Sequence, residues 1–150
     1  MYSVQCTVYS VWFFVFMFVI PIYIEAGITG FESPAAQCKE LGLSLDQLLI
    51  KHPDVTFIGI ASGQSMQGVG IYDGDLLLVD RAVDASTGDI VVASYNGCFV
   101  CKIIDKDNRL LLSASDEFKP VYVSPEDDFC LEGVVTRSIR LHKPCLEFSN

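Results

Sequence analysis

A serine and a lysine are the residues of this chain whose surroundings could support chemistry. Ser65 lies in the glycine-rich turn "ASGQSMQGVG", and a serine in such a turn usually bonds nearby backbone and does nothing more. Lys102 lies in "FVCKII", whose apolar residues indicate burial, and a buried ammonium is costly. Desolvation lowers the pKa of a lysine, so a neutral amine beside a serine hydroxyl can act as its general base. The two residues could therefore form a Ser-Lys dyad.

A pair of cysteines offers a second kind of chemistry. Cys98 and Cys101 have the C-x-x-C spacing of zinc sites and redox enzymes. They fall in a strand-like run, in which residues three apart point to opposite faces, and a second ligand pair at zinc spacing is missing. We therefore expect no metal site and no cofactor. The six cysteines also lack the regular spacing of a small secreted domain, which favours reduced thiols in a cytosol.

Composition and charge limit the function classes. A chain of 150 residues with 51% hydrophobic and 19% charged residues fits one compact domain. The formal net charge of -9 argues against direct binding of nucleic acid, because phosphate contacts need clustered Lys and Arg and the 10 basic residues form no run. Any connection with DNA is expected to run through partner proteins.

The first 24 residues form a separate, charge-free block. Its core at 11–20 is an apolar run that is long enough for a signal-peptide core and short for a membrane span. No basic residue orients an insertion, and Pro21 interrupts the run. We expect an extended arm on a cytoplasmic protein. Membrane attachment through residues 7–24 before cleavage is the alternative, and an atypical or artefactual start stays open.

The sequence pattern of the remaining residues predicts a linker, one short helix and a β domain. Residues 25–40, "EAGITGFESPAAQCKE", form the exposed, turn-rich kind of segment that proteases cut. In "LSLDQLLIKHP", Ser44 is a helix N-cap with Gln47 three residues later. Seven strand-like runs follow, and Asn96-Gly97 predicts a two-residue hairpin turn. The pattern is typical of a barrel-like or sandwich β fold; the runs are 55–62, 75–80, 89–95, 98–104, 109–115, 120–124 and 130–141.

A series of motifs connects Ser65 and Lys102 with a known family. The strings "SGQSM", "DGDLLLVD", "GDIVVA", "NGCFVCK" and "SPEDDFCLEGVV" follow one another in the chain. In this order they closely resemble the UmuD branch of the LexA/UmuD self-cleaving serine peptidases, family S24, over about residues 27–141. The resemblance implies a mostly β protein: one LexA/signal-peptidase-like β domain of short antiparallel strands, with a flexible N-terminal arm and one short helix. It also implies that Ser65 is the nucleophile and Lys102 the general base, and that backbone N–H groups at Met66 and Gly63 support the oxyanion.

The resemblance further implies a cleavage segment, "ITGFESPAA". The aligned scissile bond is Thr29-Gly30. Members of the family usually have Ala or Cys before this glycine, so Thr29 is a departure and Ala26-Gly27 is the fallback bond. The expected division is an arm of residues 1–29 that self-cleavage removes and a peptidase domain of residues 30–150.

Partners and competing functions follow from the same resemblance. It implies that a RecA-DNA filament promotes self-cleavage in the SOS response, and that the trimmed homodimer joins a UmuC-like Y-family polymerase in translesion synthesis.

A type I signal peptidase is a competing function, because that family shares the Ser-Lys chemistry, the Ser-Met dipeptide and an N-terminal anchor. Here "QGVG" replaces its Pro-Thr after Ser-Met, and its Arg and Gly-Asp-rich pattern after the lysine is absent. A degenerate S24 domain that only binds partners is the non-enzymatic alternative, and the presence of both Ser65 and Lys102 counts against it.

Overall fold

A computed structural model describes residues 43–143 of the chain. These residues belong to two compact units with a boundary between Leu49 and Ile50. The predicted arm, the cleavage segment and the border at residues 29 and 30 lie outside the described residues. Within the described range, no helix has the length and apolar character of a membrane span.

The short helix α1, Leu45–Leu49, begins as the sequence predicts. The Ser44 backbone N–H donates to Gln47 Oε1 at 2.9 Å, and the Gln47 N–H donates to Ser44 Oγ at 3.2 Å. These reciprocal bonds form a capping box, which satisfies two N–H groups that the helix itself leaves without partners.

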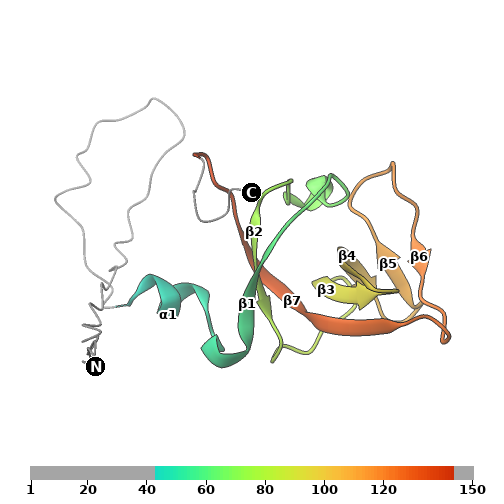
Figure 1. Ribbon diagram of the computed structural model, residues 1–150, viewed down its shortest axis with the longest axis horizontal. Helices are drawn as coiled ribbons and strands as arrows, with labels where there is room; N and C mark the ends of the chain where they lie inside the picture. Colours follow the sequence, from blue (N-terminus) through green and yellow to red (C-terminus); the bar gives the residue numbers. More distant parts are fainter. Residues whose placement is uncertain (1–42, 144–150) are drawn as a thin grey trace, which may run out of the picture. The chain divides into compact units, whose positions relative to one another are not determined.

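Each of the seven predicted runs overlaps one strand of a single antiparallel sheet, and the bounds differ by a few residues (Figure 1). The order across the sheet is β1-β2-β7-β3-β4-β5-β6, so β1 and β6 are its edges. The mostly β fold with short antiparallel strands and one short helix is therefore confirmed. The strands are β1 (Thr56–Ile60), β2 (Leu76–Asp80), β3 (Ile90–Tyr95), β4 (Cys98–Asp105), β5 (Leu110–Leu112), β6 (Val121–Tyr122) and β7 (Phe129–Ile139).

The hairpin between β3 and β4 has the predicted turn. Asn96 and Gly97 both adopt positive φ, 47° and 83°, as a type I′ turn requires. This turn sets the register of the hairpin, in which Val91 lies opposite Lys102. The hairpin thus places the lysine well inside a paired strand.

The long strand β7 joins the two halves of the sheet, pairing with β3 along its first part and with β2 along its last part. Its register shifts once against each neighbour, so that Glu132 and Thr136 are left out of the pairing. Such bulges bend a strand and increase its twist. In Figure 1, β7 sweeps from β2 across to β3 as one long curved ribbon.

Apolar side chains cover both faces of β3. Val91 and Val92, which point to opposite faces, are 0% and 8% exposed and belong to different core clusters. The cluster around Val92 also contains Met66 and Ile71, from the loop between β1 and β2. The core therefore anchors the loop that carries Ser65.

Candidate active site

Ser65 lies in the loop between β1 and β2, which is closed at its base. The Ala61 N–H donates to the Asp75 carbonyl and the Gly74 N–H donates to the Ala61 carbonyl, each at 2.8 Å. Next to Ser65, the Met66 side chain is only 4% exposed and packs in the core. Because Met66 is fixed inside, its half-buried neighbour Ser65 is held at the surface of the core.

An arginine just beyond β7 ties the second half of this loop to its base. Arg140 Nε and Nη2 lie 3.0 and 2.9 Å from the Asp75 carboxylate, and Nη2 donates to the Gly70 carbonyl at 2.7 Å. The guanidinium also lies over the Tyr72 ring, 4.0 Å from its centroid. Hydrogen bonding from Arg140 lowers the pKa of the buried Asp75 carboxyl, although burial alone would raise it. Charge-assisted bonds of this kind fix geometry as well as stabilise, so Arg140 holds Gly70 in place relative to the base of the loop.

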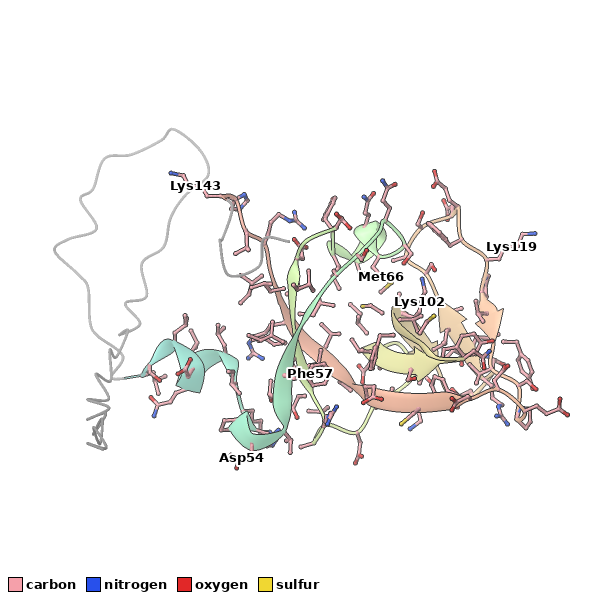
Figure 2. The ribbon with its side chains drawn as sticks, in the orientation of Figure 1. Asp54, Phe57, Met66, Lys102, Lys119 and Lys143 are labelled. Carbon is pink, nitrogen blue, oxygen red and sulfur yellow. The ribbon has the colours of Figure 1, made fainter. Side chains whose placement is uncertain are left out.

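Lys102 reaches Ser65 from β4. Its Nζ lies 2.7 Å from Ser65 Oγ and 3.0 Å from Ser113 Oγ, and 5.7 Å from the centroid of the Phe118 ring. Met66 and Lys102 lie close together in Figure 2, and both line one cleft. In the sheet order, β7 and β3 separate β2 from β4, so the loop between β1 and β2 has to span this distance to reach Lys102. The structure thus brings together the two residues of the predicted dyad.

The surroundings of Lys102 shift its amine toward the neutral form. Burial lowers the pKa of this lysine. None of the ion pairs among residues 43–143 includes it. The adjacent Cys101 is no counter-ion near neutral pH, because burial raises the pKa of its thiol to about 11. An uncharged amine within hydrogen-bond distance of a hydroxyl is the arrangement that a general base needs.

The segment after β5 contacts both residues of the predicted dyad. Ile103 lies opposite Leu112, which puts Ser113 next to Lys102 across the two strands. The following residue, Ala114, donates its N–H to the Ser65 carbonyl and accepts from the Gly68 N–H, both at 2.8 Å. The approach is close enough that a Cβ on Gly68 would stand 2.2 Å from the Ala114 oxygen. Position 68 therefore requires glycine.

Two backbone N–H groups near Ser65 were predicted to support the oxyanion. The Gly63 N–H donates to Asp73 Oδ1 at 2.7 Å and is thus engaged within the loop, where Gly63 has φ +89°. The Met66 N–H has no acceptor among the described residues and remains available. The role of each group in catalysis stays a prediction.

Ser65 and Lys102 line a cleft of about 150 Å³. A neighbouring groove continues from it between β1 and β4, with Ile60 and Phe99 on its walls. Both side chains are unusually exposed for their type, at 55% and 76%. The predicted scissile residues, Thr29 and Gly30 or Ala26 and Gly27, lie outside the described residues.

The C-x-x-C pair lies on β4. Cys98 is exposed, whereas Cys101 is half-buried, and their thiols are free, as is that of Cys130. Among residues 43–143, no group of three or more His, Cys, Asp or Glu side chains is placed to hold a metal ion.

Three residues that shape this site were not predicted from the sequence. Ser113 contacts the amine, Gly68 allows the close approach of Ala114, and Arg140 braces the loop. The string "QGVG" contained Gly68, and the register of the fourth and fifth runs could have pointed to Ser113. No local signal marks Arg140, because its partner Asp75 is 65 residues away.

Comparisons with known proteins agree with this geometry. Residues 20–136 match the model of the family described as Peptidase S24-like. The chain is 36% identical to protein MucA of Salmonella typhimurium over 129 residues, which cover 85% of this chain and 88% of MucA. It is 40% identical to protein ImpA of Shigella flexneri over 128 residues, covering 81% and 84% of the two chains. It is also 40% identical to the LexA repressor of Bordetella avium over 82 residues, 53% of this chain and 38% of that repressor.

The family model and the relatives thus lead to the same conclusion as the motifs around Ser65 and Lys102. The matched region contains every described strand except the end of β7. This chain belongs to the S24 family of peptidases, as its resemblance to the LexA/UmuD proteins predicted.

Proposed function

We propose that this chain is a self-cleaving serine peptidase in which Ser65 is the nucleophile and Lys102 the general base. The observation that carries the proposal is the 2.7 Å separation of Lys102 Nζ and Ser65 Oγ, with the lysine half-buried and without a described counter-ion. The alternative of a degenerate S24 domain would not need a lysine kept in this costly position.

In the proposed reaction, neutral Lys102 takes the proton of Ser65, and Ser65 Oγ attacks the carbonyl carbon of Thr29. The Met66 N–H helps to stabilise the oxyanion, and one such donor is typically worth about 3 kcal/mol. The C–N bond to Gly30 then breaks, and the new amine takes the proton from Lys102. Lys102 then deprotonates a water molecule, which attacks the ester carbonyl on Ser65. As the bond to Ser65 Oγ breaks, this oxygen takes the proton from Lys102, and residues 1–29 are released.

Substrate and enzyme belong to one chain, so docking of the cleavage segment controls the rate. The effective concentration of the cleavage segment near the cleft takes the place of a binding affinity for a separate substrate. The observed rate therefore depends on how often the segment occupies the cleft. The groove beside the dyad lies along β1, an edge strand of the sheet. An extended peptide segment can pair with the backbone of an edge strand and place its apolar side chains against the apolar walls of a groove. The cleavage segment could bind here in this way.

The biological setting rests on the resemblance to the LexA/UmuD family. In this proposal, a RecA-DNA filament stimulates docking during the SOS response, and the trimmed homodimer serves a UmuC-like Y-family polymerase in translesion synthesis. The protein acts in the cytoplasm and reaches DNA through these partners.

The proposed scissile bond is Thr29-Gly30, so the product is expected to begin at Gly30. A lysine at position 30 would not fit beside the nucleophile, and Gly30→Lys should slow cleavage at this bond at least roughly tenfold. N-terminal sequencing of the self-cleaved product, with rates from gel densitometry, checks both expectations. Gly27→Lys is the matched control and should have the smaller effect. A product that begins at Gly27 would move the assignment to the Ala26-Gly27 bond.

The cytoplasmic proposal requires that the apolar leader does not anchor the protein. Ser65→Ala should retain the leader because it cannot cleave itself. After fractionation of cells that produce it, we expect this variant in the soluble fraction as a dimer. Recovery in the membrane pellet after carbonate washing would show that residues 7–24 attach the uncleaved chain to a membrane.

A further inference from the structure

We propose that Ser113 is a positioning residue for Lys102, which holds the amine so that its lone pair faces Ser65. The proposal rests on the function proposed above. Three described contacts meet at this point: Lys102 Nζ to Ser65 Oγ at 2.7 Å, Lys102 Nζ to Ser113 Oγ at 3.0 Å, and the Ala114 N–H to the Ser65 carbonyl at 2.8 Å.

The number of hydrogens on the amine explains why a third residue is useful. A neutral lysine amine has two N–H donors and one lone pair, and a general base must present the lone pair to the hydroxyl. Rotation about the last C–N bond would otherwise turn an N–H toward Ser65. When Ser113 Oγ accepts one N–H, it restricts this rotation, and the lone pair can accept the proton of Ser65.

The fold holds Ser113 firmly in the required place. It follows β5 directly, across from Lys102 in the register of β4 and β5, and it is half-buried. The next residue is bonded through its backbone to both Ser65 and Gly68. One short segment therefore fixes the distance between the nucleophile loop and the hydroxyl that orients the base.

Other groups around the amine cannot replace Ser113. Cys101 is its neighbour on β4, and Phe118 presents an aromatic ring, which accepts hydrogen bonds poorly. Asp116 and Glu117 follow in the same segment, but their side chains are exposed and neither pairs with Lys102 among the described contacts. Of the described side chains, only the hydroxyls of Ser65 and Ser113 are hydrogen-bonded to the amine.

The test compares Ser113→Ala with the parent at alkaline pH, where the amine is deprotonated in both proteins. We expect the plateau rate of self-cleavage to fall roughly tenfold, because the base is present but poorly oriented. The control is Ser115→Ala. The Ser115 hydroxyl lies two residues away, accepts a hydrogen bond from the Glu117 N–H and does not contact Lys102. The control variant should therefore cleave itself at the parental rate. A Ser113→Ala rate within twofold of the parent would overturn the inference.

An isosteric pair keeps the test decisive if the alanine variant folds poorly. Ser113→Thr keeps the hydroxyl and Ser113→Val replaces it by a methyl group of similar shape. The threonine variant should cleave roughly tenfold faster than the valine variant at the plateau. Equal rates for the two would mean that the segment matters only for packing.

Titration of Lys102 separates this inference from the proposed function. NMR of the Lys102 side chain is recorded in a Ser65→Ala background with and without Ser113→Ala, so no cleavage is required. Loss of an acceptor destabilises the ammonium more than the amine, and should lower the pKa of Lys102 by about 0.5 to 1. This change raises the neutral fraction but also makes the amine a slightly weaker base, which slows the plateau by only a few-fold at most. A larger fall must therefore come from orientation. An unchanged titration contradicts the Ser113 contact, whereas a parent that never cleaves contradicts the proposed function.

Discussion

Replacing Lys102 with methionine is expected to lower the rate of self-cleavage at least roughly 100-fold, which is the usual contribution of a general base. Methionine has a side chain of similar length and shape but cannot accept the proton. The parent should cleave itself faster as pH rises, because the Lys102 amine must be neutral to accept the proton of Ser65. Since burial lowers the pKa of Lys102, the rise should end at a lower pH than for an exposed lysine. First-order rates from neutral to strongly alkaline pH give both results.

Lys106→Met is the matched control for this experiment. Lys106 follows the same strand, and its Nζ donates to the Ala85 carbonyl at 2.9 Å, away from the dyad. The control should keep both the rate and the pH profile. If Lys102→Met retained the alkaline rise, another group would be the base.

Gly68→Ala is expected to lower the rate roughly 100-fold, with Lys102 and Ser65 both unchanged. The added methyl group would meet the backbone oxygen of Ala114 at 2.2 Å, so the loop must move away from the segment after β5. That movement breaks the Gly68–Ala114 bond and strains the bond between the Ala114 N–H and the Ser65 carbonyl. The self-cleavage rate and the thermal unfolding midpoint should both fall.

Gly59→Ala on β1 is the control for the effect that replacing a glycine by alanine has on stability in general. A Cβ there meets no atom within 4 Å, and the backbone does not need glycine. Its unfolding midpoint should stay near that of the parent. A Gly68→Ala protein that cleaves at the parental rate would mean that the contact with Ala114 does not position the nucleophile.

Local patterns were enough to predict the elements of this fold. The seven runs were recognisable because β-branched and aromatic residues alternate with turn signals, and because Asn96-Gly97 demands two positive φ values. The capping box of Ser44 and Gln47 spans three residues and needs no tertiary information. Lys102 was conspicuous because a charged residue within an apolar run is costly to bury.

The rest of the site depends on contacts between distant parts of the chain. Ser113 meets Lys102 only through the register of β4 and β5, and Arg140 meets Asp75 only because β7 curves back beside β2. The bulges at Glu132 and Thr136 that accompany this curvature leave no clear pattern in the sequence. Residues that orient a site are therefore harder to predict than the residues that react.

The most direct test of the account is the intact mass of the purified chain during incubation at alkaline pH, beside Ser65→Ala. We predict that the parent yields two fragments whose masses add up to that of the whole chain plus one water, with the larger fragment beginning at Gly30. Ser65→Ala should keep its full mass throughout. A parent that remains intact, or a Ser65→Ala protein that yields the same fragments at the parental rate, would contradict self-cleavage by the Ser65–Lys102 pair.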